Sequence, residues 1–493
     1  MTVLVWMLVA PLVTALLGAV RAPRRVTEAI IAGGLSVTFV LCLATASQFL
    51  DGAIPSAFDD ALRVDGLSAL VLVLCGFTGL VSGTYGIGYL RRNEARGLVT
   101  PRMRAEFAVL IPVYVFAMLL VAVSNNLGVL WIAVELTTLA SVFLVAFHNR
   151  DTSLEAAWKF LMLGSLGLGF ALLGTVLLFA SAQGALGEEL SALNWTRFME
   201  LAPRLHPFTL RLGVVFALIG YGTKAGLAPM HTWKPDAYRE APSPAGVLMA
   251  VGMLNGALYC LLRVHLISTA ALGADFSGGL LLALGLLSVL VAMPFILIQW
   301  DLKRLLAYSS IEHVGIMAVG VGLGGETAVF GALLHMTYHT FAKPVAFFSA
   351  GTLAQLHQSS DFEAIGPGTL GRAPVASALL VLAAMFVTGS PPFSLFFSEM
   401  MILRGGFLGS HVVATSVFLA ALIILFCGFA YQIGRLVLGP QPHDRPAPAP
   451  ETLDFGLGVT LVAAVIAVVS TFYLPGPMIA LIHAAARVVS GGA

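Results

Sequence analysis

Long apolar runs separated by short polar segments fill almost the entire chain. A window of about 20 apolar residues, the length that crosses the hydrocarbon core of a bilayer, predicts about fourteen helices. The predicted spans are 3–20, 28–50, 66–89, 106–124, 127–148, 155–181, 211–230, 243–265, 279–299, 303–323, 327–354, 373–403, 411–438 and 455–474. Lipid offers no hydrogen bonds to backbone groups, so runs of this length are expected to be helical. We therefore predict an all-α, multi-pass integral membrane protein.

Composition and charge agree with this class. Hydrophobic residues make up 58% of the 493 residues and charged residues only 10%, less than half the charged share of a soluble domain. The 26 Lys and Arg nearly balance the 25 Asp and Glu, so no strong field favours nucleic acid. The loops that carry Arg21–Arg25 and Arg91–Arg104 hold most of the loop cations. The positive-inside rule places these loops in the cytoplasm and both termini on the outer side of the cell inner membrane.

The sequence shows no pattern for a metal or a redox cofactor. Its four cysteines, Cys42, Cys75, Cys260 and Cys427, lie far apart inside apolar runs, which favours a packing role over a metal or disulfide role. We find no cysteine cluster for iron–sulfur binding, no dinucleotide fingerprint and no haem ligand pair. We therefore expect no cofactor, metal or catalytic residue in this chain, and any oxidoreductase reaction would belong to partner subunits.

Ionisable residues inside the predicted spans are the candidate functional groups, because charge at bilayer depth is costly. Glu135, in VLWIAVELTTLAS, lies about ten residues into its helix and near the midplane. Lys224, in IGYGTKAGLAPMHTWKPDAYREAPSP, lies among glycines, and Pro229 is expected to interrupt its helix. The following loop, which contains His231, is expected to form a cytoplasmic entrance. A structural ion pair at Glu135 and a lysine that reaches the surface at Lys224 are the alternatives.

The second half of the chain holds a larger group of such residues. Glu312 and His313 are neighbours in DLKRLLAYSSIEHVGIMAVG, so their side chains point about 100° apart on one helix. His335, His339 and Lys343 follow at i, i+4 and i+8, which places them on one helix face. A lone histidine in such a helix would more often be a packing residue. Three titratable groups in one stripe favour a proton wire instead.

Glu399 follows a second predicted interruption, at Pro391 and Pro392. An acidic residue near the outer interface is the alternative to a functional role there. Two interrupted helices, each beside a buried charge, are typical of inverted-repeat transporters, which predicts two inverted five-helix repeats. The predicted division of the chain is an N-terminal group of three helices, a first repeat, a second repeat and a C-terminal helix with its tail, at 1–105, 106–265, 279–438 and 453–493.

Several of these segments resemble one known family. The strings RVDGLSALVLVL, ELTTLAS, KAGLAPMHTWKPDAYREAPSP, DLKRLLAYSSIEHVGI and HMTYHTFAKPVAFFSAG resemble the antiporter-like membrane subunits. That family includes proton-pumping subunits of respiratory complex I, Mrp-type cation/proton antiporters and membrane-bound hydrogenases. The resemblance runs from about residue 63 to about residue 406. The Ser-Ser-Ile-Glu-His run around Glu312 is more similar to hydrogenase-4 component F than to complex I.

The resemblance implies roles for individual residues. Glu135 and Lys224 match a pair thought to control proton entry, and Glu399 matches an acidic residue at the exit. His335, His339 and Lys343 match the central hydrophilic axis. Asn255 is a departure, because many complex I members have a lysine there and Asn cannot titrate. Either Glu312 and His313 replace the lost site, or the path is altered or blocked.

The function predicted from these observations is proton translocation in a membrane subunit of a redox-driven complex, similar to hydrogenase-4 component F. The predicted pathway consists of Glu135, Lys224, His231, Asn255, Glu312, His313, His335, His339, Lys343 and Glu399. The expected partners are other membrane subunits and peripheral iron–sulfur or hydrogenase-type subunits. A complex I subunit and an Mrp-type cation/proton antiporter subunit are the nearest alternatives. Sodium is the alternative to the proton as the transported ion. A stand-alone secondary transporter and a purely structural anchor are more distant ones.

Overall fold

The computed structural model describes residues 2–20, 22–182, 190–440 and 451–491. Nearly all of the regular structure in this part of the chain is helical. The helices of the first half are α1 (Val3–Ala19), α2 (Arg24–Leu50), α3 (Gly66–Ala95), α4 (Pro101–Val123), α5 (Leu127–Val145), α6 (Asp151–Ser181), α7 (Trp195–Leu201), α8 (Pro207–Ala225), α9 (Lys234–Glu240) and α10 (Ser243–Val247). Those of the second half are α11 (Leu254–Leu272), α12 (Ala274–Leu297), α13 (Leu302–Leu323), α14 (Gly325–His357), α15 (Phe362–Ile365), α16 (Pro374–Val387), α17 (Ser394–Leu408), α18 (Val412–Leu438), α19 (Phe455–Phe472) and α20 (Gly476–Val489).

Short elements complete the described structure. A two-stranded antiparallel hairpin pairs β1 (Ser56–Ala57) with β2 (Leu62–Arg63). The 3-10 turns are η1 (Ala146–His148), η2 (Leu190–Leu193), η3 (Ala202–Arg204) and η5 (Thr369–Gly371). A π-helical turn, η4 (Leu248–Met253), joins α10 to α11. The sequence pattern did not predict this turn, and π-turns inside helices often occur at functional sites.

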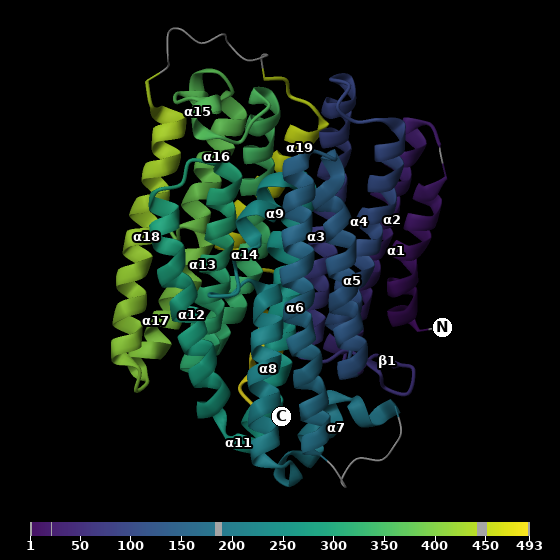
Figure 1. Ribbon diagram of the computed structural model, residues 1–493, viewed down its shortest axis with the longest axis vertical. Coiled ribbons are helices and arrows are strands. Elements are labelled where there is room, and N and C mark those ends of the chain that lie inside the picture. The colour runs from purple at the N-terminus through teal and green to yellow at the C-terminus, as the bar shows by residue number, and fades with distance from the viewer. Residues whose placement is uncertain (1, 21, 183–189, 441–450, 492–493) are drawn as a thin grey trace.

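The long helices form one bundle whose axes run roughly parallel (Figure 1). Ten helices among the described residues are at least 18 residues long and apolar enough to cross a bilayer. The prediction of an all-helical membrane protein is therefore confirmed, and the fourteen crossings remain a prediction. Helix α14 lies inside the bundle and packs against α3, α13, α16, α17 and α19. This position encloses the titratable stripe of α14.

Both predicted interruptions are present. Helix α8 ends at Ala225, Gly226 adopts a left-handed conformation with φ of 75°, and α9 begins eight residues later at Lys234. Helices α16 and α17 are separated in the same way by the segment that contains Pro391 and Pro392. Proline lacks the backbone donor that a continuous helix needs, which explains why the helices stop here. Each break leaves helix ends inside the bundle.

Glycines allow the closest helix contacts. A Cβ atom at Gly220 of α8 would lie 2.3 Å from the backbone nitrogen of Ala171 on α6. A Cβ at Gly285 of α12 would lie 2.7 Å from the nitrogen of Val319 on α13. Such backbone-to-backbone packing replaces the hydrophobic drive that lipid does not supply. It fixes α8 and α13, which both carry candidate residues.

Cations gather at one end of the bundle, which we call the basic face. This face carries the start of α2, the end of α3 and the start of α4, with Arg24, Arg25, Arg91, Arg92, Arg96, Arg102 and Arg104. Ion pairs brace it: Arg91 to Glu28 and Arg104 to Glu94, both at 2.7 Å. Arg263, at the other end, is fully buried and pairs with Asp65 at 2.6 Å.

Candidate functional site

The first group of candidate residues joins α5 to the end of α8. The ammonium nitrogen of buried Lys224 donates to the hydroxyl of Thr138 at 2.8 Å. That hydroxyl lies 3.4 Å from the carboxylate of Glu135. Within the described residues, no ion pair shorter than 4.0 Å joins Lys224 to Glu135 directly. The expected ion pair is therefore bridged by Thr138, a residue that sequence reasoning missed because a threonine in an apolar helix looks like packing.

Glu135 is partly exposed on the side of the bundle. It lies halfway along α5, between the exposed side chains of Ile132 and Leu139. The hydroxyl of Ser165 on α6 lies 3.4 Å from its carboxylate. A carboxylate at this depth is incompatible with direct contact to lipid. The α5–α6 surface around Glu135 therefore needs a polar neighbour.

Lys234 is the second feature that sequence reasoning missed. We expected it in the entrance loop, but its side chain is fully buried in the gap between α8 and α9. Its ammonium donates to the carbonyl of Ala225, the residue that follows Lys224. Gly226 makes this possible, because a Cβ there would lie 2.3 Å from Cε of Lys234. A lysine directly before a proline gives no sign that it points inward, which explains the miss.

His231 lies in the same gap and is largely buried, and its Nδ1 has no hydrogen-bond partner in the described part of the chain. The charges that follow Lys234 form a surface network instead. Asp236 pairs with Arg304, and Arg239 pairs with Asp301 at 3.0 Å and Asp361 at 2.9 Å. The entrance loop thus has a buried part, which contains His231 and Lys234, and an outer part, in which Asp236 and Arg239 form ion pairs.

Asn255 follows the π-helical turn and is fully buried. Its Nδ2 donates to the hydroxyl of Thr340 on α14 at 3.0 Å, whereas its Oδ1 lacks a partner among the residues described. Thr340 lies next to His339 in sequence. Asn255 therefore links α11 to the titratable stripe of α14 without being able to titrate.

Lys343 holds the opposite end of that stripe. Its ammonium donates to the hydroxyl of Ser309 on α13 at 3.0 Å and to the carbonyl of Leu306 at 3.3 Å. The buried carboxylate of Glu312 on α13 attracts it electrostatically. The ammonium of Lys234 repels it. Lys343 thus interacts with the buried carboxyl group of Glu312 and the buried amine of Lys234.

Three buried histidines from two helices form the centre of the site. Nδ1 of His313 on α13 lies 3.0 Å from Nε2 of His335 on α14. The rings of His313 and His339 are 4.9 Å apart. His313 of α13 therefore lies against both His335 and His339 of α14. Helical periodicity places residues on one face, but two residues a full turn apart leave space for a side chain from a neighbouring helix.

The chain of polar groups continues into the second interrupted helix. Nδ1 of His335 lies 2.9 Å from the hydroxyl of Ser398 on α17, which itself donates to the carbonyl of Leu395 at 2.7 Å. The hydroxyl therefore accepts a hydrogen bond from Nδ1–H of His335, which leaves Nε2 of His335 as the acceptor for Nδ1–H of His313. Glu399 is the next residue and is largely buried against Gly389. Ser398 was not among the predicted residues.

The described residues contain neither a metal-binding cluster nor a disulfide bond. Among the residues described, no group of three or more His, Cys, Asp or Glu is arranged to hold a metal ion. Cys42, Cys75 and Cys260 are buried, Cys427 is exposed, and all four are free. Most of the candidate residues lie buried inside the bundle, on α8, α11, α13, α14 and α17.

Comparison with known proteins identifies the family of this chain. The model of the family described as "NADH:quinone oxidoreductase/Mrp antiporter, TM" matches residues 124–424. The hydrogenase-4 component F homolog of Methylacidiphilum infernorum is 36% identical over 76% of this chain and 77% of its own length. The NADH-quinone oxidoreductase subunit N of Desulforudis audaxviator is 30% identical over 80% of this chain and 77% of its own length.

Solved structures share the fold. A chain of an archaeal membrane-bound sulfane sulfur reductase superimposes with a TM-score of 0.86 at 21% identity, over 99% of this chain and 98% of that one. A chain of respiratory complex I from Thermus thermophilus gives 0.72 at 25% identity, over 96% and 97%. The resemblance found in the sequence motifs is confirmed: this chain belongs to the NADH:quinone oxidoreductase/Mrp antiporter family of membrane subunits.

Proposed function

We propose that this chain is a proton-translocating membrane subunit of a redox-driven complex of the hydrogenase-4 component F type. The observation that carries the proposal is the line of buried titratable groups through the bundle, from Lys224 to Glu399. Hydrogen bonds connect its last part across three helices. Ionisable groups inside a membrane bundle mark ion pathways, and histidine exchanges protons near neutral pH, which favours protons over sodium.

The transfer begins at Glu135 and Lys224. The hydroxyl of Thr138 connects these two groups, because it accepts from the ammonium of Lys224 and donates to the carboxylate of Glu135. A redox event in a partner subunit would change the charge near Glu135. At low effective dielectric, such a change alters the proton affinity of a buried lysine strongly. Lys224 would then release its proton towards the interior of the bundle.

Lys234 receives this proton in place of a lysine at position 255. Its ammonium is bound to the residue next to Lys224 and lies within the electrostatic reach of Lys343 and His339. Because two nearby ammonium groups repel each other, loading Lys234 favours release from Lys343. Asn255 then serves as a hydrogen-bonding neighbour of Thr340. The sequence left open a replacement of the lost site by Glu312 and His313, an altered path and a blocked path, and the proposal is the altered path.

The histidines complete the path. Each imidazole can accept a proton on one nitrogen and release one from the other. His339, His313 and His335 follow one another at ring or hydrogen-bond contact, and His335 leads to Ser398. Glu399 is the release group beside Ser398. Glu312 balances the charge of Lys343 during the transfer.

The position of Glu135 supports the proposal that this chain has partner subunits in the membrane. Its partly exposed carboxylate halfway along α5 requires a neighbouring membrane subunit on the α5–α6 surface. Peripheral iron–sulfur or hydrogenase-type subunits would supply the electron chemistry. The organisation that we propose has fourteen crossings and both termini on the outer side of the cell inner membrane. The first inverted repeat would be 106–265 and the second 279–438, flanked by 1–105 and 453–493.

Affinity purification of the tagged chain in mild detergent tests this assignment. We expect mass spectrometry to recover a nickel–iron hydrogenase-like large subunit together with iron–sulfur proteins. Peripheral NADH-oxidising subunits would identify the complex I alternative, and small hydrophobic antiporter subunits alone the Mrp alternative. A chain that purifies without companions and carries ions alone in liposomes would contradict the proposal.

A further inference from the structure

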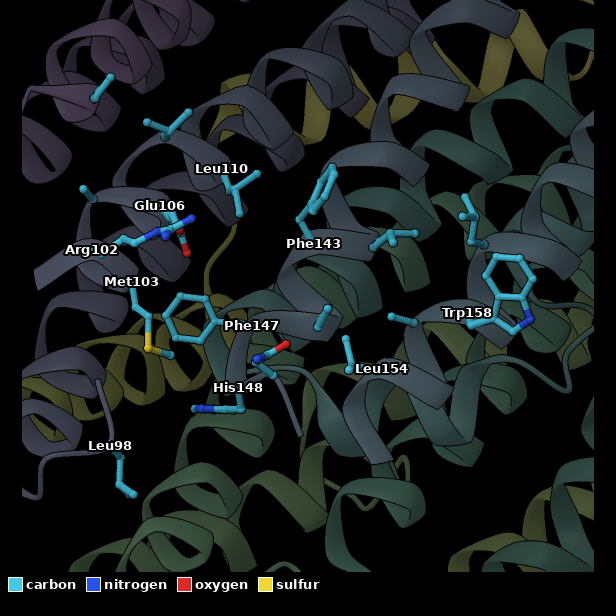
Figure 2. A pocket seen from close by; sticks show the side chains of 18 residues that line it. Leu98, Arg102, Met103, Glu106, Leu110, Phe143, Phe147, His148, Leu154 and Trp158 are labelled. Carbon is cyan, nitrogen blue, oxygen red and sulfur yellow. The ribbon is translucent and has the colours of Figure 1, made fainter. Parts of the chain in front are cut away.

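Two cavities meet at the basic face. The first is an apolar groove of about 1200 Å³ between α4, α5 and α6. Figure 2 shows Leu110, Phe143 and Phe147 along this groove and Trp158 at the side opposite Arg102. Phe143 and Trp158 are 62% and 61% exposed. The groove therefore opens to the lipid side of the bundle, close to the interface where Trp residues gather.

The second is a polar cavity of about 370 Å³ formed by α3, α9, α14 and the starts of α6 and α13. Leu98 and His148 line both cavities, so the two cavities adjoin each other at these residues. The hydroxyl of Tyr89 lies 2.9 Å from Nε2 of His148 at this junction. A single molecule with a polar head and an apolar chain could therefore occupy both.

The polar cavity carries unbalanced positive charge. Its charged lining consists of Arg96, Arg150, Arg239, Lys303, Glu240 and Asp361. Arg239 pairs with two carboxylates, Asp301 and Asp361, and Asp301 and Glu240 also attract the ammonium of Lys303. Within the described residues, Arg96, Arg150 and Lys303 have no carboxylate within 4.0 Å. Lys303 donates instead to the backbone carbonyls of Arg239 and Ala241, at 2.8 and 2.7 Å.

We propose that these two cavities together bind one anionic phospholipid. The phosphate lies in the polar cavity against Arg96, Arg150 and Lys303, and an acyl chain lies in the groove along Phe143 and Trp158. Basic pockets between transmembrane helices recognise such headgroups, and each cation near the surface adds to the attraction. A helix of a neighbouring subunit would cover the groove but would leave the net positive charge of the polar cavity without a counterion. A free anion would bind in the polar cavity but has no apolar part that could occupy the groove.

The test measures lipid binding to the purified full chain by native mass spectrometry. Phosphatidylglycerol and phosphatidylcholine are the two probes, and the charge variant is Arg96→Gln combined with Arg150→Gln. We expect the variant to bind phosphatidylglycerol about 30-fold more weakly than the unmodified chain, as the loss of two interfacial cations implies. Binding of phosphatidylcholine should change little. The matched control is Arg25→Gln, an exposed arginine of the same face that lines neither cavity.

A second variant, Phe143→Asp, tests the groove and should weaken both lipids. Melting temperatures close to that of the unmodified chain establish that the variants fold. Equal binding of phosphatidylglycerol by the charge variant and the control would overturn the proposal. It would also be overturned if inorganic phosphate alone displaced the lipid at similar concentration, or if cross-linking in the complex placed a subunit helix in the groove. None of these results depends on proton transfer.

Discussion

Replacement of His335 by phenylalanine is expected to slow proton transfer through this subunit by a factor of roughly 10² to 10⁴, the usual contribution of a proton-transferring side chain. His335 hydrogen-bonds to both α13 and α17, through His313 and Ser398. Phenylalanine keeps the ring volume but removes both nitrogens. The line of groups would then end at His313.

The measurement is proton translocation by the intact complex in inverted membrane vesicles, with the redox rate followed in the same sample. The matched control is His265→Phe. His265 is also buried and hydrogen-bonded, to Ser277 at 2.8 Å, but it lies outside the pathway. Equal translocation by the two variants would exclude His335 from the path. Equal loss in both would indicate that replacing any buried histidine disturbs the bundle.

Replacement of Lys234 by leucine is expected to have a similar effect, a loss of roughly 10²-fold or more. The side chain of Lys234 fills the space that Gly226 leaves. Its ammonium donates to the carbonyl of Ala225, the residue that follows Lys224. Leucine retains the apolar stem but cannot carry a proton. The same vesicle measurement applies, with exposed Lys159 replaced by leucine as the control.

Two further variants separate titration from charge. Arginine stays protonated in proteins, so Lys234→Arg keeps the charge but cannot pass a proton onward. We expect it to remain defective. Asn255→Lys, introduced into the Lys234→Leu chain, places a titratable group beside Thr340 and should restore part of the transfer. Normal translocation by Lys234→Arg would show that Lys234 supplies only a fixed charge.

Much of the fold was predictable because the bilayer imposes a strict length and polarity on each helix. The interruptions at Pro229 and Pro391 were predictable for a similar reason, since proline removes a backbone donor wherever it occurs. The candidate groups were also recognisable one by one, because an ionisable residue in an apolar run is rare. These features depend on local sequence alone.

The connections between helices were not predictable in this way. Periodicity gives the face on which His335 lies, but it does not show that His313 from α13 inserts beside it. The bridge of Thr138 between Glu135 and Lys224 depends on how closely α5 and α8 approach. The burial of Lys234 depends on the space left by Gly226. Each of these contacts depends on how two segments that are distant in sequence pack together, and local sequence patterns do not show this packing.

The most direct test of the central claim is the number of protons translocated per electron in the complex that carries Lys224→Ala. Lys224 is buried at the end of α8, where its ammonium donates to the hydroxyl of Thr138. If this chain conducts protons along the line described, the variant complex keeps its redox rate in uncoupled vesicles while its proton yield falls. An unchanged proton yield, with the variant present in the complex at its normal amount, would contradict the account.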